Sequence, residues 1–257
     1  TLTGYPGTLT AQDIAGIQTS IPVTVSGSVT TSSSLLNDIS SMGRTSVTAT
    51  TSDAITDSVT RERRPYEGDL LIVQPLTYAT TNDVMDVRAT WNWLLANPSQ
   101  YTEYRLAAAI GVRDDYMRTA DVAYVRSVYD AVRTQVEATV TVDSATGLVA
   151  SNGTVDLVDW PRTELSGYDV DGTRYKTVVN VFAVASYEAL ADLATALGRT
   201  SEATTYSRTA DLIKQAVITR LYDSSTGTYY DGLTARRALV RHAAAQNSYV
   251  ALAYGVY

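Results

Sequence analysis

Pairs of helical segments joined by very short turns dominate this sequence and restrict the folds it can adopt. The segments 101–119 and 121–140 meet at Ala120, and the segments 175–198 and 201–223 meet at Gly198-Arg199-Thr200. Helices joined by so few residues pack antiparallel as hairpins. Repeated hairpins with irregular stretches between them predict a mainly α fold, part of an (α/α)6 toroid of six hairpins. A tetratricopeptide-like array is the alternative, but its 34-residue signature is absent.

The first part of the chain has a different texture. Residues 17–30 alternate apolar and polar side chains, which predicts a strand. From Ser32 onward, Leu35, Leu36, Ile39 and Met42 recur at helical spacing behind a run of serines. We count about seven helices, whereas a closed toroid needs twelve. The predicted domains are therefore the end of a β domain with its linker at 1–30, and the N-terminal portion of the barrel at 31–257.

Composition excludes several functional classes. The formal net charge is −7 and the pI about 4.7, so neither nucleic acid nor an anionic membrane is an expected partner. No apolar run reaches the roughly 18 residues of a membrane span. The chain has no cysteine and a single histidine, so we predict no metal and no cofactor. Acid–base chemistry must then fall mainly on carboxylates.

The location of the protein is suggested only by its polar composition. Lysine occurs just twice, beside abundant serine and threonine. This composition favours an extracellular or secreted protein, with a cytoplasmic one as the alternative.

One charged stretch stands out in a chain that is otherwise poor in charge. Residues 57–69, Asp-Ser-Val-Thr-Arg-Glu-Arg-Arg-Pro-Tyr-Glu-Gly-Asp, hold four carboxylates and three arginines. Pro65 and Gly68 place the stretch in a loop. Converging carboxylates shift one another's pKa and serve acid–base chemistry, whereas a surface ion-pair network is the structural alternative.

This stretch resembles the signature of the bacterial-type α-L-rhamnosidases, which are six-hairpin glycosidases. The resemblance assigns the general acid to Glu62. It places Asp57 at the opening aspartate, Tyr66 at a position that holds tryptophan in the family, and Asp69 at the closing aspartate. Arg61 would orient sugar hydroxyls.

The resemblance extends to other parts of the chain. Asp159-Trp160 is similar to the family's Asp-Trp loop over the sugar, and Trp160 is the second aromatic candidate for stacking on the substrate. The start of the chain is similar to the last strands of the β-sandwich that precedes the family's barrel. Most of the 257 residues are covered.

The family implies an inverting hydrolysis that releases terminal α-L-rhamnose from a glycoside or polysaccharide. In the family, the catalytic base is a carboxylate later in the sequence. We expect this base beyond the present chain, either downstream or on a second chain that completes the barrel. Another six-hairpin glycosidase, a polysaccharide lyase and a non-catalytic carbohydrate-binding or assembly component remain the alternatives. His242, at the start of the last predicted helix, is a further sugar-binding candidate, with a helix-start or core role as its alternative.

Overall fold

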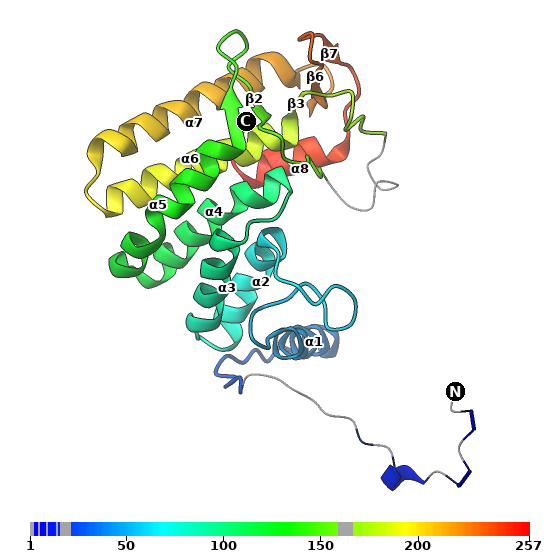
Figure 1. Cartoon of the computed structure of the whole chain (residues 1–257). Helices are drawn as coiled ribbons and strands as arrows, with labels where there is room; N and C mark the ends of the chain where they lie inside the picture. Colours follow the sequence, from blue (N-terminus) through cyan, green and yellow to red (C-terminus); the bar gives the residue numbers. More distant parts are fainter. Residues whose placement is uncertain (1–2, 5, 9, 14, 16–21, 159–166) are drawn as a thin grey trace.

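The computed structural model describes residues 3–4, 6–8, 10–13, 15, 22–158 and 167–257. Within these ranges, helices form most of the chain and confirm the mainly α class (Figure 1). The helices are α1 (Ser34–Thr50), α2 (Glu67–Thr80), α3 (Met85–Ala96), α4 (Thr102–Thr119), α5 (Val122–Thr139), α6 (Thr177–Ala196), α7 (Thr200–Leu221) and α8 (Ala245–Ala253), with a 3-10 turn, η1 (Ala11–Asp13), near the start.

The strands are short, antiparallel and confined to the connections between helices. They form a hairpin of β1 with β2, a hairpin of β4 with β5, and a sheet in the order β3-β6-β7. Their bounds are β1 (Val140–Val142), β2 (Val149–Ser151), β3 (Tyr175–Lys176), β4 (Tyr222–Asp223), β5 (Thr228–Tyr229), β6 (Gly232–Leu233) and β7 (Leu239–Val240). Part of the connection between α5 and α6, one of the stretches expected to be irregular, is therefore the β1–β2 hairpin.

The helices pack as hairpins in two layers. The pairs α2–α3, α4–α5 and α6–α7 are each joined by a short turn, as predicted for the last two pairs. In one layer α2 contacts α4, α4 contacts α6 and α6 contacts α8, while α3 contacts α5 in the other. Figure 1 shows these helices side by side, with α1 lying against the α2 end. The described part of the chain is thus a row of helical hairpins.

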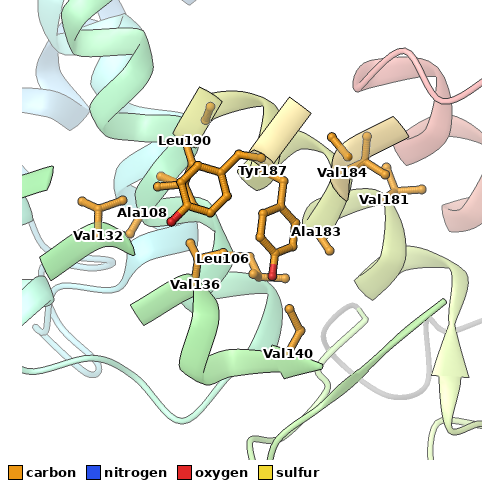
Figure 2. Packing of buried hydrophobic residues seen from close by; sticks show 14 of the residues in the cluster. Leu106, Ala108, Val132, Val136, Val140, Val181, Ala183, Val184, Tyr187 and Leu190 are labelled. Atoms are coloured by element: carbon orange, nitrogen blue, oxygen red, sulfur yellow. The ribbon is translucent and has the colours of Figure 1, made fainter. Parts of the chain in front are cut away.

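The hydrophobic core lies between the two layers. Figure 2 shows aliphatic side chains of α4, α5 and β1 packed against the aromatic ring of Tyr187 and its neighbours on α6. Helix α6 has the length and hydropathy of a membrane span, and 83% of that window is buried inside the protein. Because α4, α5, α7 and α8 all contact α6, this helix is the centre of the core.

A buried polar chain fixes α2, α3 and α4 to one another. The Trp91 indole on α3 donates to the side-chain oxygen of Gln74 on α2, at 2.6 Å. The amide nitrogen of Gln74 donates in turn to the backbone oxygen of Gly111 on α4, at 3.0 Å. All three helices are therefore held at one crossing point by fully satisfied polar groups.

The structure corrects part of the strand predicted at 17–30. Residues 22–30 form no strand, and the amides of Ser26 and Gly27 instead donate to the Thr80 carbonyl at the end of α2. Because the carbonyl of Thr80 lies at a helix end, it is free to accept these bonds. The remaining residues of the predicted strand, 17–21, lie outside the described ranges.

Helix α1 is present where its pattern predicts it, with the Ser33 hydroxyl accepting the Leu36 amide as an N-cap. Its apolar row does not enter the core. The side chains of Leu35, Leu36, Ile39 and Met42 are all exposed, and Val47 is the buried residue of this helix.

The position of Gly68 is also a correction. We expected Gly68 to interrupt regular structure, yet it lies in the first turn of α2. A β-carbon at Gly68 would come within 2.4 Å of the Tyr104 ring. The glycine is therefore required by the close approach of α4 and not by a turn.

Candidate active site

The N-terminal ends of α2, α4, α6 and α8 are joined by hydrogen bonds. Glu67 in the first turn of α2 accepts the amide of Ser99, just before α4. Asp156 accepts the hydroxyl of Thr102, the first residue of α4, and the ammonium of Lys176, just before α6. These contacts place the beginnings of the helices at one end of the molecule, where helix dipoles and free amides favour binding of polar ligands.

The α6 and α8 ends share a second acidic junction. The Thr177 amide donates to the backbone oxygen of Asp231, and the Ala244 amide donates to the Asp231 carboxylate. Asp231 is fully buried and its carboxylate also accepts the side chain of Asn247.

The charged loop before α2 is closed upon itself. The Asp57 amide donates to the Arg64 carbonyl at 2.9 Å, and the Arg64 amide donates to the Asp57 carboxylate at 3.0 Å. Glu62 is anchored at its amide by the hydroxyl of Ser58. The guanidinium of Arg61 lies 3.2 Å from the Glu62 carboxylate and 3.9 Å from that of Asp57. The loop therefore brings together side chains that are five residues apart in sequence.

A pocket of about 300 Å³ opens at this loop. Five of the predicted site residues line it, together with three that the sequence did not indicate. The predicted residues are Asp57, Arg61, Glu62, Tyr66 and Asp69, and the additional ones are Tyr101, Tyr104 and Leu157. The pocket thus combines three carboxylates and a guanidinium with an aromatic and aliphatic wall.

Three tyrosines form that wall. The ring of Tyr101 lies 5.4 Å from that of Tyr104 and 6.4 Å from that of Tyr66, measured between centroids. Tyr66 and Tyr104 are 6.2 Å apart in an edge-to-face arrangement. Tilted aromatic pairs at these distances are stable and present both ring faces and hydroxyl groups. Such a surface suits a sugar, which has apolar patches and hydroxyls on the same ring.

The tyrosine hydroxyls are connected to the carboxylates. Burial raises the pKa of the Tyr66 phenol to about 12, and its hydrogen bond to Glu62 adds to this shift. Tyr104 is hydrogen-bonded to Asp69, and burial likewise raises the pKa of the Tyr104 phenol. Both phenols are therefore neutral donors to carboxylates in the physiological range.

Two of the pocket carboxylates act on the third. Burial raises the pKa of Asp69, and the negative charges of Asp57 and Glu62 raise it further. A carboxylate site with charges this close is suited to acid–base chemistry and to binding sugar hydroxyls.

A second cavity of about 370 Å³ adjoins the first along the α2 helix. It shares Asp57, Asp69 and Tyr104 with the first pocket and continues to Phe182 on α6 and Tyr254 after α8. The rings of Phe182 and Tyr254 pack 5.2 Å apart. The site is therefore bordered by an apolar floor provided by the same layer of helices.

His242 lies outside the residues that line these two pockets. It precedes α8 by three residues and does not open the helix as expected. Its Nδ1 is 2.7 Å from the Asp231 carboxylate, and its side chain is 43% exposed. The imidazole is thus oriented by a buried acid, and its role in sugar binding stays a prediction. The two further predicted residues, Asp159 and Trp160, lie outside the described ranges.

The three pocket residues missed by sequence reasoning come from distant segments. Tyr101 and Tyr104 belong to the start of α4, and Leu157 to the connection after β2. One signal could have found the tyrosines, because in a hairpin toroid the layer containing α2 and α4 begins at the same end of the molecule. Among the described residues, no three His, Cys, Asp or Glu side chains gather as a candidate metal site.

Comparison with known proteins identifies the family of this domain. The sequence profile of the bacterial alpha-L-rhamnosidase 6 hairpin glycosidase domain matches residues 24–256. The chain belongs to this family. The match includes the whole described row of hairpins and confirms the six-hairpin fold expected from the charged motif and the helical pairs. A search of curated proteins gives no match.

Solved structures agree with the fold of the six-hairpin rhamnosidase family. A GH78 family rhamnosidase of Bacillus sp. GL1 matches with a TM-score of 0.81 at 22% identity, over 91% of this chain and 26% of that one. A rhamnosidase from Klebsiella oxytoca with rhamnose bound matches with a TM-score of 0.74 at 19% identity, over 89% of this chain and 45% of that one. The chain therefore spans about a quarter of the first protein and less than half of the second.

Proposed function

We propose that the protein containing this chain hydrolyses terminal α-L-rhamnosides, with Glu62 as the general acid. One observation carries the proposal: Asp57, Glu62 and Asp69 line a single pocket that also contains three tyrosines. The spacing of these carboxylates carries the resemblance to the family, and their convergence supports it. The family membership of the chain gives the sugar.

Each group in the pocket has a chemical role in this proposal. Glu62, whose side chain is 39% exposed, is accessible to a glycosidic oxygen and would protonate it as the bond breaks. Asp57 and Asp69 would accept hydroxyls of the sugar, and Arg61 would orient Glu62. The tyrosine wall would receive the apolar edge that carries the methyl group of a 6-deoxysugar.

The other half of the reaction needs a base. In an inverting glycosidase a second carboxylate, about 6.5–9.5 Å from the acid, activates water on the opposite face of the sugar. We place this base outside the present chain, in the remainder of the barrel. The intact protein is therefore the form to assay.

Hydrolysis of an aryl α-L-rhamnoside by the intact protein and by Glu62→Gln tests this function. We expect the variant to lose about 10²- to 10⁴-fold in kcat, because glutamine cannot donate the proton. Asp53→Asn is the matched control, since it removes one exposed carboxylate near the same loop without changing the pocket lining.

Unchanged turnover in Glu62→Gln would exclude Glu62 as the acid. If the intact protein released other sugars but no rhamnose, the substrate assignment would be wrong while the hydrolytic function could stand. Absence of any hydrolysis, with retained sugar binding, would favour the non-catalytic alternative.

A further inference from the structure

The connection after β2 is docked along the start of α4. Val155 forms an isolated parallel bridge with Tyr101. Its amide donates to the Gln100 carbonyl at 2.8 Å, and its own carbonyl accepts the Thr102 amide at 2.9 Å. The next residue, Asp156, accepts the Thr102 hydroxyl at 2.6 Å. The segment is thus held against α4 immediately before it reaches the pocket.

Glu103 holds the two residues that follow. One oxygen of its carboxylate accepts the Leu157 amide and the other accepts the Val158 amide, each at 3.0 Å. The Glu103 side chain lies in the first turn of α4, and the residue is only 3% exposed. It does not line the pocket itself. A buried carboxylate that accepts two successive backbone amides fixes the path of the chain at that point.

The backbone conformation at Val158 shows why such a constraint is needed. Val158 has a φ of +62°, in the left-handed region that β-branched residues rarely occupy. A conformation of this kind persists only when the surroundings determine it. The hydrogen bonds from the Leu157 and Val158 amides to Glu103, a residue outside the connection, hold the backbone in this conformation.

This arrangement fixes the position of Leu157 at the pocket. Its side chain lines the same cavity as Tyr101, Tyr104 and Glu62. Its amide is fixed by Glu103, so the position of the aliphatic part of the wall depends on that carboxylate.

We propose that Glu103 is a positioning residue for substrate binding, which fixes Leu157 so that the pocket wall fits the apolar edge of the sugar. This inference rests on the proposed function for its substrate. It adds a residue that touches neither the sugar nor the reacting atoms and acts through the backbone of Leu157 and Val158.

Protonation of Glu103 should make sugar affinity depend on pH. Burial raises the pKa of Glu103 to about 7, the charge of Asp156 raises it further, and the bonds from the two amides oppose these effects. The other described groups that face it are the phenols of Tyr104 and Tyr168, while Lys176 is paired with Asp156. A protonated carboxyl group has lost acceptor capacity for one of the two amides. Sugar affinity is therefore expected to fall as the pH decreases through about 7.

The test uses Glu103→Gln in the intact protein. Glutamine keeps the shape but offers one acceptor oxygen for two amides. We expect KM for the aryl rhamnoside to rise about tenfold, which corresponds to about 1.4 kcal/mol, with kcat changed less than twofold. Hydrogen exchange at the amides of Leu157 and Val158 should accelerate. The rise of KM on acidification should disappear.

Two comparisons separate positioning from general destabilisation. Gln135→Met is the matched control, because the Gln135 side chain donates to the Arg105 carbonyl of α4 from the α5 side, away from the pocket. It should leave KM unchanged. Leu157→Ala removes the wall itself, so adding Glu103→Gln to it should raise KM no further.

The proposal is overturned if amide exchange accelerates without a change in KM, if neither changes, or if the effects of Glu103→Gln and Leu157→Ala simply add. Amide exchange needs no substrate, so it reports on Glu103 even if the rhamnosidase function is wrong. In that case the KM comparison is made with the glycoside that the intact protein does cleave.

Discussion

By its resemblance to the family signature, Tyr66 occupies a position that holds tryptophan in the family. Tyrosine in place of tryptophan changes more than the size of the ring. Its hydroxyl is hydrogen-bonded to Glu62, the proposed acid, and the Arg64 guanidinium lies 5.5 Å from the centre of its ring. In the proposed function, a phenol at this place would both cover the sugar and orient the acid. An indole would present its single donor from a different point of the ring system.

Removing only the hydroxyl separates these two roles. In Tyr66→Phe the ring remains, and Glu62 loses its hydrogen bond with the phenol, an interaction of about 0.5–1.5 kcal/mol. We expect kcat to fall up to about tenfold with little change in KM, whereas Tyr66→Ala should raise KM as well. Steady-state kinetics on an aryl rhamnoside give both values. A fall confined to KM in Tyr66→Phe would assign the hydroxyl to sugar binding instead.

At the residue scale the sequence indicated the charged loop but not the residues from other segments that complete the pocket. Asp57, Glu62 and Asp69 could be predicted together because they lie within 13 consecutive residues of the sequence, in the loop before α2 and in the first turn of that helix. Glu103 carries no local signal, since its importance comes from Leu157 and Val158, more than 50 residues away. Such a pair becomes visible only when the packing of the connection on α4 is known.

Among the helices, glycine has opposite meanings at two positions. Gly111 lies on α4 where a β-carbon would come within 2.1 Å of the Trp91 ring. Gly43 lies on α1, and a β-carbon there would meet only the Leu76 side chain at an ordinary 3.6 Å. The first glycine allows two helices to approach closely, while the second only lowers helix propensity.

Alanine at each position should therefore shift stability in opposite directions. We expect Gly111→Ala to lower the free energy of unfolding by about 1–3 kcal/mol, because a well-packed core must move to admit the methyl group. Gly43→Ala should raise it by about 0.5–1 kcal/mol. Urea denaturation of both variants measures the difference. Equal effects at the two glycines would contradict the assigned packing.

Element type followed largely from the sequence, because helical periodicity and short turns are local properties. The failures occurred where tertiary contacts override local pattern. The alternation at 17–30 predicts a strand, but residues 22–30 lie against the end of α2 without strand pairing. Gly68 lies within a helix, and it is glycine because the neighbouring Tyr104 ring leaves no room for a β-carbon. The exposed row of α1 shows that helical spacing does not by itself identify a buried face.

For the whole molecule, buried carboxylates set the dependence of stability on pH. Burial raises the pKa of Glu67, Asp69 and Glu103, which lie in the first turns of α2 and α4. Hydrogen bonds from Arg237 and Ser225 lower the pKa of Asp143 and Asp223, respectively, to about 2. The carboxylates with raised pKa values and those with lowered pKa values make the stability change with pH in opposite directions. The pH ranges of the two effects meet near pH 4.5.

The direction of each effect follows from the linkage between proton binding and folding. A carboxylate whose pKa is raised in the folded state stabilises the fold below its unfolded value and loses that contribution as the pH rises, for Glu103 between about 4.5 and 7. A carboxylate with a lowered pKa loses its contribution as the pH falls from about 4 to 2. The net charge of −7 at neutral pH adds self-repulsion in the same upper range.

We therefore expect maximal stability near pH 4.5, on the acid side of the usual range of about 5 to 8. Glu103 alone should contribute at most about 2–3 kcal/mol to the decline between pH 4.5 and 7, at about 1.4 kcal/mol per pKa unit. Urea unfolding at pH 4.5, 6 and 7.5 measures the curve, and Glu103→Gln should flatten it. A maximum above pH 6 would show that these carboxylates are not desolvated as the structure places them. If the decline is found, the ionised Glu103 that binds the pocket wall is maintained at a cost in stability to the whole domain.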